Sequence, residues 1–430
     1  MNISILIPVV IIVGLILINA PIWIAMLGGM LPYFLFLGDG LPAQILIQRF
    51  VATTESSSYL AVPFFITAGA IMNRAGLSER MLDFADSLVG HLRGGLAHVN
   101  ILLSVLMGGV SGSAAADAAM ESKILVPEME RRGYDLEFSA AVTVASSLIT
   151  PIIPPGMGLI IYSMAAGVSV GRMFAAGYLP GILCMVGFMI YVHFVAKKRD
   201  YLPSREKMAP LKEILRLFRH AIWALLMPLG LLMALRAGLL TASETGAACC
   251  LYCLLIGTVI YKQFHLKDVI PTIVESVMGT ASVVTIMCTS NVLAYFLSYE
   301  NIPRRLTEMI VNAGVGKFGF LLIVNIFIFI LGMFVSSGMI PILATLLAPI
   351  AISLGVDPVH FGIIVVFGVT IGNMTPPFGA VLYQVAGLTK CSVAKLAKEC
   401  LPFIAVMVIV LFIITYSETL ALAIPNLIYN

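Results

Sequence analysis

Two stretches without a charged side chain each contain a pair of consecutive prolines. Pro154–Pro155 lies in the middle of residues 138–171, and Pro376–Pro377 lies in the middle of residues 358–389. Proline lacks a backbone N–H and clashes with the preceding turn, so each pair is expected to interrupt a helix. Both stretches have membrane length, and an unpaired backbone group inside a bilayer is costly unless protein, water or an ion satisfies it. Both breaks are therefore expected to be buried in protein, filled with water or occupied by ions.

The oxygen atoms near these breaks are of the kind that a small hard cation prefers. Freed backbone carbonyls, the hydroxyls of Ser146 and Thr150, and the amide oxygen of Asn373 together favour Na⁺. A packing kink that binds nothing is the alternative for a single proline pair. Two pairs at matched positions, each beside a turn rich in glycine and serine, favour the binding role.

Those two turns precede the breaks. Residues 108–113 read Gly-Gly-Val-Ser-Gly-Ser, and residues 336–338 read Ser-Ser-Gly. Glycine permits a tight reversal, and hydroxyls and helix-terminal N–H groups can face an anion or contribute to a cation site. Close helix packing is the alternative for the first glycine pair. Asp117 lies just past the first turn and should face a cavity or a partner, unless it caps a helix or lies nearer the surface, because a charge at the bilayer centre costs at least ~2.5–3.5 kcal/mol.

These considerations give two predicted sets of site residues. The predicted Na⁺ ligands are Ser111, Gly112, Ser146, Thr150, Pro151, Ser336, Ser337, Gly338, Gly372, Asn373 and Thr375. The predicted substrate contacts are Ser113, Asp117, Pro154, Pro155, Gly156, Pro376 and Pro377. No residue is predicted to be catalytic, and Na⁺ is the one metal expected, with no organic cofactor.

The composition requires a membrane. Of 430 residues, 60% are hydrophobic and 11% are charged, against about 45–50% and about 25% in soluble domains. A soluble enzyme, a disordered scaffold and a nucleic-acid binder are excluded, because so few charges cannot cover the surface of a soluble globule. The seven cysteines lie in or beside apolar runs, so they are interpreted as small apolar fillers.

The charge pattern predicts an all-α polytopic membrane protein with about 11 transmembrane helices and two re-entrant hairpins. The first two spans are expected at about residues 3–18 and 22–38. Eight Lys and Arg in residues 197–219 place that loop in the cytoplasm. Re-entrant hairpins at 94–131 and 318–353 bring most other basic residues to the same side, in segments 74–93, 121–132, 262–267 and 390–398. The N-terminus is then periplasmic, and residues 205–219 suggest a helix on the cytoplasmic surface.

A duplication underlies this pattern. Residues 127–182 align without a gap on residues 349–404 at an offset of 222. Matched prolines, glycines and an aspartate carry the alignment, and further upstream the offset becomes 225. Each copy contains three crossings, an odd number, so the copies must enter the membrane from opposite faces. The predicted units are scaffold helices 1–50, a first inverted repeat 51–196, a basic linker with surface helix and scaffold helices 197–270, and a second inverted repeat 271–430.

The residues quoted above, and those around them, resemble a known family. Gly94-Gly95-Leu96-Ala97, residues 108–117, residues 151–155, Leu240-Thr241-Ala242-Ser243-Glu244 and residues 371–379 are similar to the large membrane subunit of tripartite ATP-independent periplasmic (TRAP) transporters. Thr150 and Gly156 stand where that family more often has glycine and serine, and Val335-Ser336-Ser337 differs from its usual acidic or Asp-Pro second tip. These departures concern the cation and substrate contacts rather than the family.

The resemblance implies an elevator-type, Na⁺-driven importer of an organic acid in a bacterial inner membrane, closest to the sialic-acid branch. It also implies two protein partners, a small four-helix membrane subunit (Q) and a soluble periplasmic substrate-binding protein (P). A stand-alone Na⁺/dicarboxylate symporter is the nearest alternative. An intramembrane hydrolase is a further alternative, disfavoured because the spans offer no Asp pair and no Ser-His or Glu-His arrangement.

Overall fold

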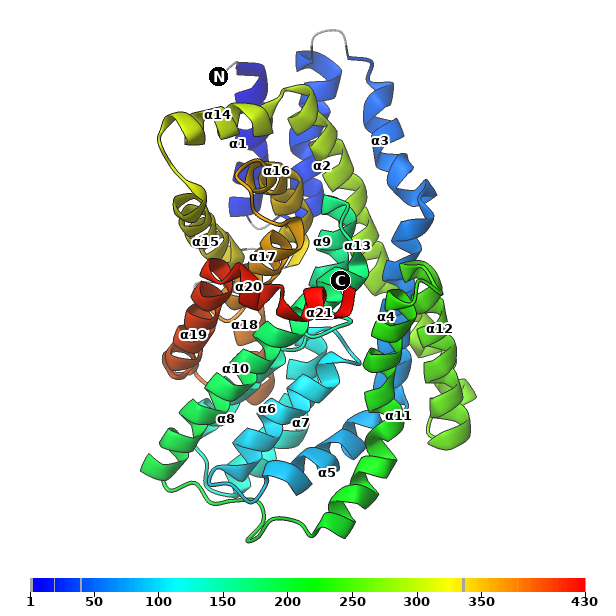
Figure 1. Cartoon of the computed structure of the whole chain (residues 1–430), viewed down its shortest axis with the longest axis vertical. Helices are drawn as coiled ribbons and strands as arrows, with labels where there is room; N and C mark the ends of the chain where they lie inside the picture. The colour runs from blue at the N-terminus through cyan, green and yellow to red at the C-terminus, as the bar shows by residue number, and fades with distance from the viewer. Residues whose placement is uncertain (1–2, 19, 39–40, 335–336, 377, 430) are drawn as a thin grey trace.

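The computed structural model describes residues 3–18, 20–38, 41–334, 337–376 and 378–429. Within these residues every regular element is a helix, which confirms the predicted all-α class (Figure 1). Five helices are long and apolar enough to cross a membrane: Val170–Lys198, Leu211–Arg236, Ala242–Ile260, Leu266–Tyr299 and Val393–Tyr416. The expected total of about 11 spans stays a prediction, since the other apolar helices have 10–17 residues.

The N-terminal helices pack as a hairpin against a long helix from the middle of the chain. This hairpin consists of α1 (Ile3–Leu17), α2 (Ile22–Pro32) and the π-helical turn η1 (Tyr33–Leu37), and the long helix is α13 (Leu266–Tyr299). Tyr33 anchors the contact, because its ring lies 4.5 Å from that of Phe296 at an interplanar angle of 77°. Its hydroxyl donates to a carboxylate oxygen of Glu300. Both predicted spans at this end are helices.

The first copy contains a helical hairpin folded against an interrupted helix. α6 (Gly95–Gly108) and α7 (Ala114–Arg131) form the hairpin, and α8 (Leu136–Ser147) and α9 (Met157–Ala166) are the two halves of the interrupted helix. Residues 148–156 form the break, and Pro154–Pro155 is a cis peptide. α3 (Gln44–Glu55), the 3-10 turn η2 (Ser57–Leu60), α4 (Ala61–Arg74) and α5 (Leu77–Val89) precede the hairpin, and α10 (Val170–Lys198) follows the break.

The second copy has the same order of elements. α14 (Ile302–Asn312) precedes a hairpin of α15 (Lys317–Phe334), the 3-10 turn η4 (Ser337–Met339) and α16 (Ile340–Ser353). α17 (Pro358–Gly372) and α18 (Ala380–Thr389) are separated by a second break, and α19 (Val393–Tyr416), α20 (Glu418–Ala421) and α21 (Ala423–Tyr429) end the chain. A proline pair thus falls in each interruption, although Pro377 itself lies outside the described residues.

Close contacts join the two copies. The hydroxyl of Tyr162 in α9 donates to the carbonyl oxygen of Pro358 at 3.0 Å. A Cβ added at Gly362 would lie 2.3 Å from the Tyr162 ring, so only glycine lets α9 and α17 approach this closely. At the other end of the copies, the Phe188 and Phe403 rings of α10 and α19 meet edge to face, with centroids 5.3 Å apart. The interrupted helices are therefore held at fixed positions by neighbours from both copies.

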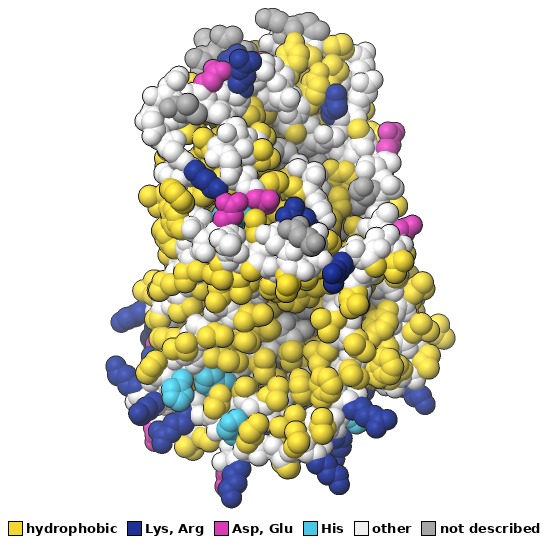
Figure 2. All heavy atoms as spheres, viewed as in Figure 1, with side chains coloured by type: hydrophobic (Ala, Val, Ile, Leu, Met, Phe, Trp, Pro, Cys, Tyr) yellow, Lys and Arg dark blue, Asp and Glu magenta, His cyan; other side chains and the backbone are white. Residues whose placement is uncertain are grey.

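The basic loop is fastened to the ends of several helices. Arg199 lies 3.0 Å from Asp135 and 2.9 Å from Glu399, so it links the two copies. Arg205 lies 2.5 Å from Asp86 in α5 and 2.9 Å from Glu213 in α11 (Leu211–Arg236). Figure 2 shows Lys and Arg side chains gathered at this end of the molecule, beyond a broad hydrophobic belt.

The surface helix expected over residues 205–219 does not exist as a separate element. Residues 204–207 form a bend, and Leu211 begins a continuous helix of 26 residues that ends at Arg236. The reason is physical: no helix-breaking residue separates the amphipathic turns from the apolar run that follows, and Pro228 is accommodated within the helix. The amphipathic stretch is thus the first part of a membrane-length helix, which α12 (Ala242–Leu255) and the π-helical turn η3 (Ile256–Ile260) follow.

Candidate functional site

Asp117 connects the first hairpin to the first break. It lies in the first turn of α7, and 1% of its surface is exposed. The Ser111 hydroxyl, at the hairpin tip, donates to Asp117 Oδ1 at 2.6 Å. The Thr150 hydroxyl, inside the break, donates to Asp117 Oδ2 at 2.5 Å. Three of the predicted site residues, from the hairpin tip, α7 and the break, therefore meet at one buried carboxyl group.

Glu121 is a second buried carboxyl group one turn further along α7, with 0% of its surface exposed. The Ser104 hydroxyl donates to its Oε1 at 2.5 Å, and the Ser146 hydroxyl lies 3.2 Å from its Oε2. The Ser146 hydroxyl also lies 2.7 Å from the Asn100 amide oxygen. Since a serine hydroxyl has one proton, it cannot donate to Glu121 and Asn100 at once. At any moment, therefore, either the Glu121 carboxyl oxygen or the Asn100 amide oxygen lacks a hydrogen bond from Ser146.

Neither carboxyl group has a basic partner among the described ion pairs of the chain. Burying a carboxylate without a compensating charge is unfavourable, so such a group is neutralised by a proton or by a cation. The oxygen atoms around these two positions belong to hydroxyl, amide and carboxyl groups. As metal ligands, such oxygens suit Na⁺ rather than a transition metal. Among the described residues, no group of three or more His, Cys, Asp or Glu side chains could hold a metal ion.

Glycines bring the hairpin tip against the break. A Cβ added at Gly108 would lie 2.8 Å from Cβ of Ile153. Gly112 has φ +57°, and a Cβ there would lie 2.6 Å from the carbonyl oxygen of Pro155. Both values are too short for real atoms, so the tip can approach the break only because these positions have no side chain. The expectation that the first tip meets the break of its own copy is confirmed.

The second break is held mainly by its own backbone. The carbonyl oxygen of Asn373 accepts hydrogen bonds from the N–H groups of Val381 and Leu382, at 3.1 and 3.4 Å. Thr375 donates to the carbonyl oxygen of Ile371 at 3.0 Å. A Cβ at Gly372 would lie 2.1 Å from the Gly332 carbonyl carbon, so α15 and α17 touch through their backbones. The Thr375 hydroxyl is thus used within its own segment, whereas the Thr150 hydroxyl of the first break reaches Asp117 in another helix.

The predicted site residues divide by copy. In the first copy Ser111, Asp117, Ser146 and Thr150 join the network, and Ser113 is the N-cap of α7, accepting from Ala116 N–H at 3.4 Å. Pro154, Pro155 and Gly156 are buried in the break, and Pro151 is half-buried. In the second copy Gly338, Gly372, Asn373 and Thr375 are buried, and Pro376 is exposed. Ser336 and Pro377 lie outside the described residues, and Ser337 is described by its backbone alone.

Sequence reasoning missed several members of the network. Glu121 begins the segment 121–132, which the charge pattern predicts to be cytoplasmic, and the structure shows that Glu121 itself is buried where α7 passes into this segment. A signal existed: Glu121 follows Asp117 by four residues, which places both on one face of a helix. Ser104 and Asn100 carry no comparable signal. Gln384 of α18 also contacts this region, since its amide donates to the Ala115 carbonyl oxygen at 2.9 Å.

Comparison with known proteins identifies the class. The sequence profile described as "Tripartite ATP-independent periplasmic transporter, DctM component" matches residues 9–420. The chain therefore belongs to this family as a large membrane subunit of a TRAP transporter, and it is a transport protein rather than an enzyme. The family expected from the sequence is confirmed.

Individual relatives agree with this assignment. The chain is 34% identical over 397 residues, 92% of each protein, to the sialic acid TRAP transporter large permease protein SiaM of Vibrio cholerae. It is 33% identical over 401 residues, 93% of each, to the C4-dicarboxylate TRAP transporter large permease protein DctM of Pseudomonas aeruginosa. The crystal structure of the Alcanivorax borkumensis YdaH transporter shares the fold, with a TM-score of 0.64 and 14% identity over 96% of this chain and 98% of that one.

Proposed function

We propose that the chain imports an organic acid together with Na⁺ across a bacterial inner membrane by an elevator movement. The two buried carboxyl groups, Asp117 and Glu121, carry the proposal, because no described basic side chain compensates either of them. A cation bound between α6, α7 and the break would supply the missing charge. The hydroxyls of Ser111 and Thr150 and the amide oxygen of Asn100 would then serve as ligands beside the two carboxylates.

The proposed moving units are the inverted repeats 51–196 and 271–430, and segments 1–50 and 197–270 are the proposed fixed scaffold. The lipid bilayer surrounds both. The tight packing of α9 on α17, through Gly362, supports movement of the two interrupted helices as one body. The gathering of Lys and Arg side chains at the end of the molecule that carries the basic loop supports a cytoplasmic position for that loop and a periplasmic N-terminus.

The proposed partners are a periplasmic substrate-binding protein, which delivers the acid, and a small Q subunit. The small Q subunit is supported by a relative whose name, DctMQ, joins the M and Q components in one protein. This is the isethionate TRAP transporter permease protein DctMQ of Oleidesulfovibrio alaskensis, 33% identical over 377 residues, 87% of this chain and 59% of the relative. The relatives named above make sialic acid and C4-dicarboxylates the candidate substrates. The stand-alone symporter remains the rival, since it would need neither partner.

Uptake by proteoliposomes tests the proposal. The chain, reconstituted with its small subunit, is expected to accumulate the acid only with an inward Na⁺ gradient and only when the binding protein is added outside. Replacing the Na⁺ gradient by a K⁺ gradient of equal size is the control for osmotic and electrical effects. Uptake that is indifferent to Na⁺ rejects the cation assignment. Uptake that needs Na⁺ but no binding protein favours the stand-alone symporter.

A further inference from the structure

One side of α11 carries a row of basic side chains that passes into an apolar row. The spacing of four, three and four residues places these positions on one side of the helix: Lys212, Arg216, Arg219 and Trp223. All four side chains are exposed. The same side continues toward the end of the helix through Leu226, Gly230 and Ala234. We call the first three positions, 212, 216 and 219, the basic row.

The basic row has no acidic partner on the chain. Among the ion pairs of the described residues, none includes a side chain of the row. Glu213, the acid nearest to it in sequence, is held by Arg205 at 2.9 Å. Arg199, at the same end of the molecule, differs from the row because Asp135 and Glu399 compensate it. The row therefore presents three positive charges to its surroundings.

The length of α11 puts the basic row at the level of lipid headgroups. Its 26 residues rise about 39 Å, which exceeds the ~30 Å hydrocarbon core of a bilayer by about 9 Å, or roughly six residues. With Arg236 at the far surface, Lys212 and Arg216 lie outside the hydrocarbon. Arg219 lies at its edge, from which a long side chain reaches the headgroups. With the basic loop in the cytoplasm, as proposed, these headgroups belong to the cytoplasmic leaflet.

Beyond Trp223, the same side of α11 borders a mainly apolar groove of about 190 Å³ that it shares with α12. The walls include Leu226, Gly230 and Ala234 of α11 and Ala248, Cys249 and Tyr252 of α12. A Cβ at Gly230 would have no atom within 4 Å, so the groove is open at this position. Figure 1 shows the two helices side by side at the edge of the molecule. The groove thus continues the basic row as an apolar surface.

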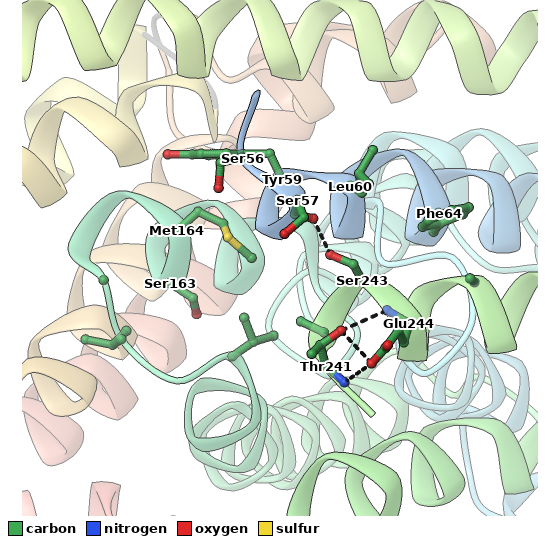
Figure 3. Close-up of a pocket in the computed structure, with 15 residues that line it drawn as sticks. Ser56, Ser57, Tyr59, Leu60, Phe64, Ser163, Met164, Thr241, Ser243 and Glu244 are labelled. Atoms are coloured by element: carbon green, nitrogen blue, oxygen red, sulfur yellow. Dashed lines mark hydrogen bonds between the residues drawn. The ribbon is translucent and has the colours of Figure 1, made fainter. Parts of the chain in front are cut away.

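The groove is preformed, because hydrogen bonds fasten α12 to α11 and fix its first turn. The hydroxyl of Tyr252 donates to the carbonyl oxygen of Trp223 in α11. The hydroxyl of Tyr261, just past η3, donates to another carbonyl oxygen of α11 at 2.8 Å. At the opposite end of α12, the backbone N–H and hydroxyl of Thr241 donate to Glu244 at 2.7 and 2.8 Å (Figure 3). The basic row and the groove therefore keep a fixed relation on one pair of helices.

These dimensions fit a phospholipid. One leaflet contains about 15 Å of hydrocarbon, half of the bilayer core, which corresponds to about ten residues of helix. Counted from Arg216, ten residues end at Leu226, where the groove begins. An acyl chain that starts at the basic row therefore passes Trp223 and ends in the groove. One turn of a partner helix, by contrast, occupies roughly 400 Å³, about twice the volume of the groove.

We propose that this side of α11 binds an anionic phospholipid, with its phosphate at Arg216 and Arg219 and one acyl chain lying over Trp223 into the groove. A zwitterionic phospholipid carries the same phosphate together with a cation, which the basic row repels. Because α11 and α12 belong to the proposed scaffold, the bound lipid fixes the depth of the scaffold while the repeats move. The inference uses the proposed orientation of the chain, but neither the proposed ion nor the proposed substrate.

Quenching by brominated lipids tests the proposal, because the chain has two tryptophans, Trp23 and Trp223. In Trp23→Phe, the fluorescence of Trp223 alone is measured in phosphatidylcholine bilayers that contain an equal fraction of brominated phosphatidylglycerol or of brominated phosphatidylcholine. The phosphatidylglycerol is expected to bind about fivefold or more tightly, since one Lys or Arg near the membrane surface contributes about fivefold. In Trp223→Phe, the remaining Trp23 should be quenched equally by both lipids, because residues 1–38 contain no charged side chain.

Charge variants in the Trp23→Phe background identify the basic row as the cause of the preference. Arg216→Gln combined with Arg219→Gln is expected to lower the preference about fivefold or more. Quenching by brominated phosphatidylcholine should stay as in the parent, which shows that the variant folds with Trp223 still facing lipid. Lys197→Gln combined with Lys198→Gln removes the same charge from the exposed end of α10 and should leave the preference unchanged.

Equal quenching of Trp223 by the two brominated lipids overturns the inference. A preference that survives the double arginine variant, or that falls as far in the lysine control, also overturns it, since general surface charge then explains the result. The measurement is repeated with a small subunit whose tryptophans are replaced by phenylalanine. A retained preference supports the lipid, and loss of quenching by both lipids means that the subunit covers this side of α11 instead. No Na⁺ gradient, acid or binding protein is needed, so failure here is distinguishable from failure of the proposed uptake.

Discussion

The hydroxyl of Thr150 lies 2.5 Å from Oδ2 of Asp117, across 33 residues of sequence. Thr150 belongs to a break in a helix, and Asp117 belongs to the return arm of a hairpin. Their contact places a carboxyl group beside interrupted backbone, deep in a protein whose surface carries a broad hydrophobic belt. Each half of this arrangement is unfavourable alone, and together they form the cation site that we propose.

The Thr150–Asp117 contact is tested by Thr150→Val, which keeps the shape and removes the donor. Leaving the buried oxygen without this bond costs about 1–3 kcal/mol. Because each 1.4 kcal/mol corresponds to about tenfold in affinity, the Na⁺ concentration for half-maximal uptake should rise by about fivefold to a hundredfold. Thr307→Val, which removes a bond to the Pro303 carbonyl oxygen within α14, should leave it unchanged. An unchanged Na⁺ dependence in Thr150→Val excludes Asp117 from the cation site.

Glu121→Gln separates charge from packing. Glutamine can still accept from Ser104, and its amide can donate to Ser146, so the melting temperature should stay the same or rise. Loss of the negative charge should abolish the dependence of uptake on Na⁺. Glu130→Gln, an exposed position on the same helix, is the matched control. A variant that melts normally and still couples uptake to Na⁺ would falsify the role given to Glu121.

Gly112→Ala tests the approach of the first tip to the break. A left-handed backbone conformation costs a non-glycine residue about 1–2 kcal/mol, and the added Cβ would also meet the Pro155 carbonyl oxygen at 2.6 Å. Gly133→Ala shares the strain, with φ +84°, and meets no atom within 4 Å. Thermal unfolding should therefore show a larger loss for Gly112→Ala than for Gly133→Ala. Equal losses of melting temperature in the two variants would mean that the contact between the new Cβ and the Pro155 carbonyl oxygen is relieved at no cost in stability.

Gly372→Ala tests the corresponding contact in the second copy. Its Cβ would lie 2.1 Å from the Gly332 carbonyl carbon, and backbone cannot rotate away as a side chain does. We expect a loss of folded protein after detergent extraction, read by size-exclusion chromatography. Gly387→Ala in α18 has open space and should be neutral or stabilising by up to ~1 kcal/mol. A normal elution profile for Gly372→Ala would contradict the backbone contact between α15 and α17.

Arg205→Ala should release the basic loop. The Arg205 side chain is 29% exposed, and its two ion pairs, with Asp86 and Glu213, are each worth about 0.2–1 kcal/mol at most surface sites. We expect little change in melting temperature but faster cleavage of residues 199–210 by a protease added from the cytoplasmic side. The charge swap Asp86→Arg with Arg205→Asp should restore resistance in part. Arg304→Ala, which removes an exposed pair with Glu308, is the control and should not alter cleavage.

The sequence by itself determined the class, because a bilayer tolerates few arrangements. Long charge-free windows predict membrane helices, the clustered basic residues at 197–219 predict orientation, and proline pairs predict interruptions, each by a local rule that needs no partner. The same local reasoning erred at residues 205–219, where amphipathic spacing alone could not tell a surface helix from the first turns of a membrane-length one.

Only the tertiary structure decided which polar groups meet. Ser104 and Glu121 are 17 residues apart and Asn100 and Ser146 are 46 apart, and nothing in either local sequence pairs them. Their contacts exist because glycines let the hairpin tip touch the break, which turns the α6, α7 and α8 faces toward one another. The cavity of about 750 Å³ lined by Tyr59, Ser163 and Glu244 (Figure 3) likewise arises from three segments that share no pattern, since its shape depends on how the helices pack and not on what any one of them contains.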